Sequence, residues 1–163
     1  MLYRAKFDVI SEAYTKDVNS IQLLPSFLEI LHMKNDGIAT SIQRDSEGRF
    51  ERAMIGLDPS WFVGGQRIFG IDAAHIKHNS YSGVQIVMVG RYGNVKNRIA
   101  AVALAPTEDY ASYHWFLSTI IDHGFDLERI PVFTDCHAAI ISAAASLNVF
   151  HMFCTRHIIG MFF

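Results

Sequence analysis

Two aspartates far apart in the sequence are the side chains best placed to do chemistry. Asp72 ends an apolar run over residues 68–71, and Asp135 ends a second apolar run over residues 130–134. Both runs are typical of buried strands. In sheets with helical crossovers, ligand sites gather at the carboxyl ends of the strands. If these two strands are neighbours, the two carboxylates converge at one edge of the sheet.

Two converging carboxylates repel each other unless a cation lies between them. Mg²⁺ suits such a pair, because this hard cation is held by one or two carboxylates together with water and substrate phosphate. Two such ions about 3.5–4 Å apart can activate a water or a 3′-hydroxyl and stabilise the leaving oxygen. We therefore interpret Asp72 and Asp135 as catalytic metal ligands. The alternative is that each aspartate only caps a loop or a helix.

Four other polar residues could take part in the chemistry or have a purely structural role. His137 follows Asp135 by two residues and could hydrogen-bond its carboxylate or a substrate phosphate, or simply begin a helix. Glu108 opens the helix after the third strand, where a negative charge interacts favourably with the helix N-terminus. His75 and His78 follow Asp72, and we expect them to lie in a solvated loop.

Cys154 and His157 form half of a zinc site, because structural zinc takes four ligands. His151, Cys136 and His137 could complete it, although none of them stands at a standard spacing. The sequence therefore leaves open whether this pair binds zinc or serves as a structural motif.

The elements that position these residues follow from apolar periodicity and turn residues. Residues 1–34 are predicted to be helical with a break at Pro25, after which Ser26 caps a second helix. Thr107 is predicted to cap the helix that ends at Gly124. The remaining predicted elements are a hairpin over 38–43 and 50–57, strands over 67–72, 84–89, 98–104, 130–134 and 149–153, and a helix over 136–147.

This order predicts an α/β fold built on a mixed sheet. Three sequential strands favour an antiparallel meander, and the following helix–strand–helix–strand order favours parallel crossovers. That is the ribonuclease H-like architecture, here incomplete. We expect two parts, an N-terminal helical segment and hairpin over residues 1–66 and a partial core over residues 67–163.

Composition narrows the class of protein without naming a function. The 163 residues are 50% hydrophobic and 18% charged, which excludes a disordered chain. Two cysteines exclude a disulfide scaffold. The net charge of −2 gives no basic surface to mark a nucleic-acid partner. No apolar run is long enough to span a membrane, and the N-terminus does not read as a secretory signal, so we expect an intracellular protein.

Several motifs in their order resemble the catalytic domain of Mutator-like element (MULE) transposases. They are Gly70-Ile71-Asp72, the Ala105-Pro106-Thr107-Glu108 segment leading into Tyr113-His114-Trp115-Phe116-Leu117, Phe133-Thr134-Asp135, and Cys154-Thr155-Arg156-His157. The similarity covers about residues 67–159. It implies a ribonuclease H-like core of the three-acid type, which uses divalent metal to cut DNA at transposon ends and join it to a target. Asp72 and Asp135 would be the first two acids.

The resemblance also implies a third acid, a glutamate beyond a helical insertion. The sequence stops at Phe163, near the point where that insertion is expected, so we expect a C-terminally truncated core that is inactive by itself. Ala73-Ala74 and Cys136-His137 depart from the family pattern around the two acids. The partners implied are transposon-end and target DNA, with a homo-oligomer allowed and no membrane. A nuclear location follows from the resemblance alone.

Two other interpretations remain open at the sequence level. The chain could be a domesticated, transposase-derived regulator that associates with DNA without catalysis, in which case Asp72 and Asp135 would tolerate substitution. It could also be a remnant without function.

Overall fold

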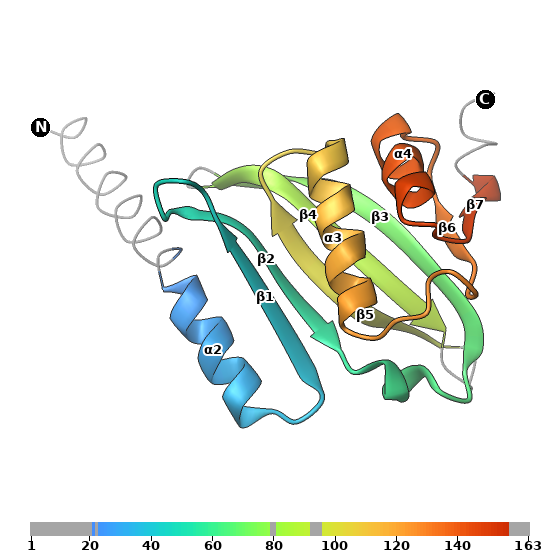
Figure 1. Ribbon diagram of the computed structural model, residues 1–163, viewed down its shortest axis with the longest axis horizontal. Helices are drawn as coiled ribbons and strands as arrows, with labels where there is room; N and C mark the ends of the chain where they lie inside the picture. The colour runs from blue at the N-terminus through green and yellow to red at the C-terminus, as the bar shows by residue number, and fades with distance from the viewer. Residues whose placement is uncertain (1–20, 22, 79–80, 92–95, 157–163) are drawn as a thin grey trace, which may run out of the picture.

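The computed structural model describes residues 21, 23–78, 81–91 and 96–156, and in this part of the chain helices flank a seven-stranded sheet (Figure 1). The predicted helix over residues 1–20 lies outside the described residues. The elements in chain order are α2 (Leu24–Lys34), β1 (Ile38–Arg44), β2 (Phe50–Leu57), a 3-10 turn (Pro59–Phe62), β3 (Gln66–His78), β4 (Tyr81–Arg91), β5 (Asn97–Ala105), α3 (Tyr110–Asp122), β6 (Val132–Thr134), α4 (Ala138–Ser146) and β7 (His151–Phe153).

The strand order confirms the predicted mixed α/β sheet of ribonuclease H-like topology. Strands β3, β4 and β5 form the antiparallel meander, and the full order is β1-β2-β5-β4-β3-β6-β7. Strand β6 lies parallel to β3, and β7 lies parallel to β6. The β1–β2 hairpin joins the same sheet through β2, which pairs with β5. The boundary that we predict at residue 66 stays a prediction.

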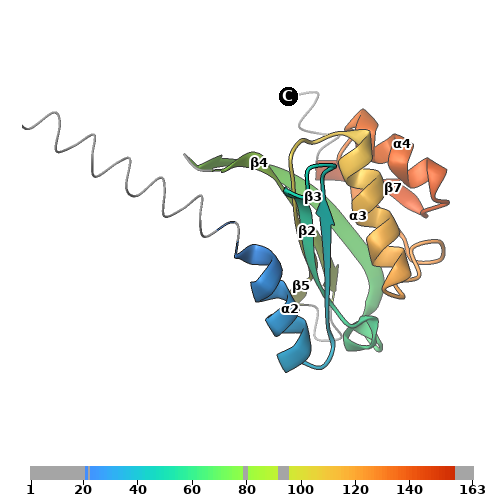
Figure 2. The ribbon, with the colours of Figure 1, turned by 60° about the vertical axis from the view of Figure 1, so that its left-hand side comes forward.

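Helices α3 and α4 cover one face of the sheet, and α2 packs against β1 on the other side (Figure 2). The stripe predicted for α3 is buried, since Tyr113, Phe116, Leu117 and Ile120 are each at most 1% exposed. Trp115 is partly buried and packs at the margin of this core. The core therefore lies between the meander and the two later helices.

Both predicted helix caps are displaced by nearby residues. Asp109, not Thr107, caps α3, because its Oδ1 accepts the Ser112 amide proton at 2.8 Å. The Thr107 hydroxyl instead donates to the other oxygen of Asp109. Helix α2 begins after Leu23 with Pro25 in its first turn, so Ser26 lies inside the helix. The observed N-cap lies two residues after the predicted one in α3 and three residues before it in α2, where Pro25 has the backbone dihedral that suits the first helical turn.

Strand β3 extends well beyond its predicted end at Asp72. It continues to His78, pairing with β4 from Ala73↔Ile86 to His78↔Tyr81. The expectation that His75 and His78 lie in a solvated loop is therefore wrong. Their backbone is extended because it pairs with β4, and the polar residues of this segment do not by themselves indicate a strand.

Among the described helices, none is long and apolar enough to cross a membrane.

Candidate active site

The two candidate aspartates follow neighbouring parallel strands, β3 and β6, whose register relates the residues just before them. These strands are parallel neighbours, as the sequence predicts, with Phe69 opposite Val132 and Gly70 opposite Phe133. Asp72 follows Gly70 by two residues, and Asp135 follows Phe133 by two residues. Each acid therefore follows one member of a paired Gly70 and Phe133 by two positions, Asp72 within β3 and Asp135 just beyond the end of β6.

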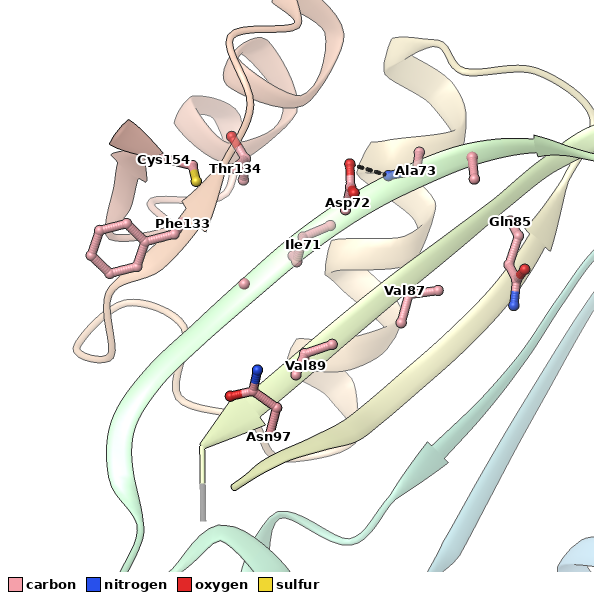
Figure 3. Close-up of a pocket in the computed structure, with 12 residues that line it drawn as sticks. Ile71, Asp72, Ala73, Gln85, Val87, Val89, Asn97, Phe133, Thr134 and Cys154 are labelled. Atoms are coloured by element: carbon pink, nitrogen blue, oxygen red, sulfur yellow. Dashed lines mark hydrogen bonds between the residues drawn. The ribbon is translucent and has the colours of Figure 1, made fainter. Parts of the chain in front are cut away.

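Asp72 lies within β3 and is exposed. Its Oδ1 accepts the amide proton of Ala73 at 3.0 Å (Figure 3). Together with Phe133, Thr134 and Cys154 it lines an open pocket of about 380 Å³. Gln85 and two valines of β4 line the same pocket, on the side of β3 away from β6. Asp72 therefore lines a mostly apolar pocket that extends over β3 from β6 to β4.

Asp135 is the first residue after β6 and begins a short turn into α4. Its Oδ1 accepts the His137 amide proton at 3.1 Å, the bond that defines an Asx turn. His137 therefore does contact the second carboxylate, but through its backbone rather than its ring. Among the described residues, no other donor reaches either Asp72 or Asp135, so each keeps one carboxylate oxygen for another partner.

The buried phenol of Tyr113 lies within electrostatic reach of both acids. Burial raises the pKa of Tyr113 far above its usual value, and its hydrogen bond to Glu108 raises it further. The charges of Asp135 and Asp72 raise the pKa in the same direction. All three carboxylates therefore raise the pKa of the same hydroxyl on α3.

Glu108 has a different environment from the one predicted. It precedes α3 by two residues, and its Oε1 accepts the Tyr113 hydroxyl proton at 2.9 Å. Its Oε2 lies 3.6 Å from His75 Nε2 on β3. The carboxylate therefore links the start of α3 to β3 rather than only facing the helix N-terminus. The spacing of Glu108 and Tyr113, five residues apart, could have suggested their contact. The contact with His75, 33 residues earlier in the sequence, depends on the tertiary structure and could not be predicted from local pattern.

Sequence reasoning missed the role of His151. We considered it as a zinc ligand, but its Nε2 lies 2.7 Å from the Thr134 hydroxyl, directly before Asp135. Burial lowers the pKa of His151, while the charge of Asp135 opposes this effect. The two residues are 17 positions apart and belong to different strands, so the pattern along the chain does not reveal their contact.

The donor set suits a hard divalent cation better than zinc. The two aspartates each offer one carboxylate oxygen, and Mg²⁺ or Mn²⁺ accepts one or two carboxylates with water in its other positions. Within the described ranges, no group of three or more His, Cys, Asp or Glu side chains could hold a metal ion. Cys154 is half-buried and lines the pocket, whereas His157 lies outside the described residues. The Cys154–His157 pair therefore stays a prediction, as does metal binding by the aspartates.

No protein-family model and no curated protein sequence matches this chain. Among solved structures, the simian T-cell lymphotropic virus intasome in complex with PP2A regulatory subunit B56 gamma is similar over 55% of this chain and 32% of that chain, at 21% identity and a TM-score of 0.42. The HTLV-2 integrase catalytic core domain in complex with magnesium is similar at 18% identity. Its dimeric form covers 56% of this chain and 63% of that chain (TM-score 0.39). Its trimeric form covers 56% and 61% (TM-score 0.38). The chain thus spans less than two-thirds of each of these proteins.

Proposed function

We propose that Asp72 and Asp135 form a divalent metal site for phosphodiester chemistry on DNA, within a transposase core of the three-acid type. The observation that supports this proposal is the parallel β3–β6 register, in which each acid follows one residue of the paired Gly70 and Phe133 by two positions. The shared effect of both charges on Tyr113 supports it independently. If each aspartate only capped a loop or a helix, we would expect neither their matching offset from the paired residues of β3 and β6 nor their common effect on Tyr113.

The residues of this chain would bind and orient the ion. Asp72 presents its carboxylate from the interior of a long strand, and Asp135 presents its carboxylate from an Asx turn. A bound Mg²⁺ or Mn²⁺ would supply Lewis acidity toward a phosphoryl oxygen and lower the pKa of bound water. The neighbouring pocket, open to solvent and lined by strands β3 and β4, leaves room for a substrate to approach Asp72.

Within this class we propose a Mutator-like (MULE) transposase, with transposon-end and target DNA as partners in a nuclear setting. The support is the order of the sequence motifs. Gly70-Ile71-Asp72 falls on β3, Phe133-Thr134-Asp135 ends β6, and Cys154 directly follows β7. The activity of the whole protein, its oligomeric state and its DNA sequence belong to this proposal. Zinc at Cys154 and His157 is not part of it.

Direct binding of Mn²⁺ to the 163-residue chain tests the proposal. We expect one Mn²⁺ to bind per chain. Binding is measured by isothermal titration calorimetry or by loss of the electron paramagnetic resonance signal of free Mn²⁺. Asp72→Asn and Asp135→Asn should each weaken this affinity at least about tenfold, equivalent to ~1.4 kcal/mol. Asp36→Asn is the matched control, because Asp36 lies in the exposed turn between α2 and β1. Equal Mn²⁺ affinity in all four proteins would contradict the proposal.

Plasmid nicking in Mn²⁺ then tests the chemistry. We expect slow nicking at most, because two carboxylates hold a second metal ion poorly. Any nicking that the site performs should disappear in Asp72→Asn and persist in Asp36→Asn. Rapid cutting that Asp72→Asn abolishes would support the metal site and overturn the expectation of low activity. Nicking that survives both aspartate substitutions would assign the cutting to a contaminant or to another site.

A further inference from the structure

The turn that carries Asp135 is tied to the preceding residue by a side-chain hydrogen bond. Thr134, the last residue of β6, is 1% exposed, and its hydroxyl donates to the carbonyl oxygen of Asp135 at 2.8 Å. A threonine hydroxyl carries a single proton. Since the Asp135 carbonyl can only accept, that proton is committed to it. Thr134 Oγ1 can then act only as an acceptor toward any other group.

His151 provides the matching donor. Its Nε2 lies 2.7 Å from Thr134 Oγ1, so the ring must carry its proton on Nε2 and donate it to the hydroxyl oxygen. The ring is fixed from two sides. His151 stands opposite Val132 in the β6–β7 register, and its imidazole packs edge-on against Phe153 with the centroids 4.9 Å apart. The donor therefore comes from a side chain that β7 holds in place.

The backbone of β7 reinforces the same contact. The Cys154 amide donates to the Thr134 carbonyl oxygen at 2.7 Å, so Thr134 is bonded to this segment through both its hydroxyl and its carbonyl. On the other side of the turn, the His137 amide holds Asp135 Oδ1 at 3.1 Å. The backbone of Asp135 is therefore fixed at its carbonyl oxygen, and its side chain is fixed at one oxygen.

We propose that Thr134 and His151 are positioning residues for Asp135, acting through a chain of hydrogen bonds from the His151 ring to the Thr134 hydroxyl and on to the Asp135 carbonyl oxygen. The second carboxylate is held at the level of Asp72 because this chain orders the turn that presents it. Its consequence for metal affinity rests on the proposed function, whereas its consequence for the order of the turn does not. Outer groups that orient a metal-binding carboxylate typically change metal affinity 10–100-fold when they are removed.

Four substitutions distinguish the effect of the hydrogen bonds from the effect of side-chain volume. Thr134→Val removes the hydroxyl at nearly equal volume, and Thr134→Ser retains it. His151→Leu removes the donor, and His151→Gln places an amide N–H near the position of Nε2. Two measurements are made on each variant of the 163-residue chain: Mn²⁺ affinity, and exchange of the His137 amide, whose bond to Asp135 Oδ1 reports the order of the turn. Urea unfolding gives the global stability against which both are compared.

We expect Thr134→Val and His151→Leu each to weaken Mn²⁺ affinity about 10–100-fold and to speed His137 amide exchange about tenfold or more under conditions where the chain stays folded. Thr134→Ser and His151→Gln should remain within about threefold of the wild-type chain. Because the two residues act through one chain of hydrogen bonds, the double variant Thr134→Val/His151→Leu should have nearly the same Mn²⁺ affinity and His137 amide exchange rate as either single variant. If His151→Leu fails to fold, Thr134→Val carries the test alone.

Unchanged exchange in a folded Thr134→Val chain overturns the inference, as does a loss of global stability with no change at His137, because that result describes a merely structural bond. Absence of Mn²⁺ binding by the wild-type chain would count against the proposed function instead. In that case the exchange measurement still decides whether Thr134 and His151 order the Asp135 turn.

Discussion

Gly83 on β4 is a position where one added methyl group should lower the stability of the fold. A Cβ at Gly83 would lie 2.6 Å from the Ala105 carbonyl oxygen and 2.7 Å from the Tyr81 hydroxyl oxygen. The Tyr81 hydroxyl donates to that same carbonyl at 3.1 Å, so the methyl group would enter an occupied contact between β4 and β5. The tyrosine ring could move away, but the Ala105 carbonyl belongs to a paired strand and cannot move without disturbing the sheet.

The free energy of unfolding should therefore fall by about 1–3 kcal/mol in Gly83→Ala. Overpacking of a buried position costs about 1–3 kcal/mol. Loss of the Tyr81 hydrogen bond adds about 0.5–1.5 kcal/mol if the ring is displaced. The reduced freedom of the unfolded chain offsets about 0.4–1 kcal/mol. At about 2–4 °C per kcal/mol for a chain of this length, the Tm should fall by about 2–12 °C.

Gly70→Ala is the matched control, because it is also a glycine within a strand. The nearest atom to its added Cβ is the Phe133 carbonyl oxygen at 3.9 Å, an ordinary contact. We expect its urea unfolding midpoint, followed by circular dichroism, to stay within about 0.5 kcal/mol of the wild-type value. Adding Tyr81→Ala to Gly83→Ala should leave most of the loss in place, since the carbonyl contact remains. A Gly83→Ala chain as stable as wild type would refute this reasoning.

Three further predictions concern the residues around the site. Burial lowers the pKa of His151, although Asp135 opposes this, so the unfolded chain binds the proton more tightly and stability should decline as the pH falls below about 6.5; His151→Gln should reduce that slope in urea titrations between about pH 5 and 7. Tyr113→Phe removes the hydrogen bond to Glu108 and should lower the free energy of unfolding by about 1–2 kcal/mol in urea, without changing the m-value. Asp109→Ala removes the cap of α3 and should cost about 1 kcal/mol by thermal unfolding, whereas Asp109→Asn should retain most of the capping energy.

The apolar runs of the sequence were sufficient to predict the topology and the parallel pairing of the two strands that lead to the aspartates. Turn residues separate these runs from one another, so the number of core strands and their order along the chain follow from local pattern alone. The extension of β3 to His78 could not be predicted in this way, because residues after Asp72 become strand only through pairing with β4. The contact of His151 with Thr134 also depends on the register of β6 and β7, which the sequence does not specify.

The two aspartates are held by unequal parts of the sheet. Asp72 lies inside a 13-residue strand that pairs with β4 along most of its length. Asp135 follows a three-residue strand that shares only two paired positions with β3. The position of Asp135 therefore depends on the buried side chains of β6, Val132 and Thr134, and on the bonds to β7. Because short, edge-side elements open more readily than the centre of a sheet, the spacing of the two acids should be lost through local opening of β6 and β7 before the meander unfolds. The cation affinity that we propose for the site should accordingly fall at a lower temperature than the global unfolding transition.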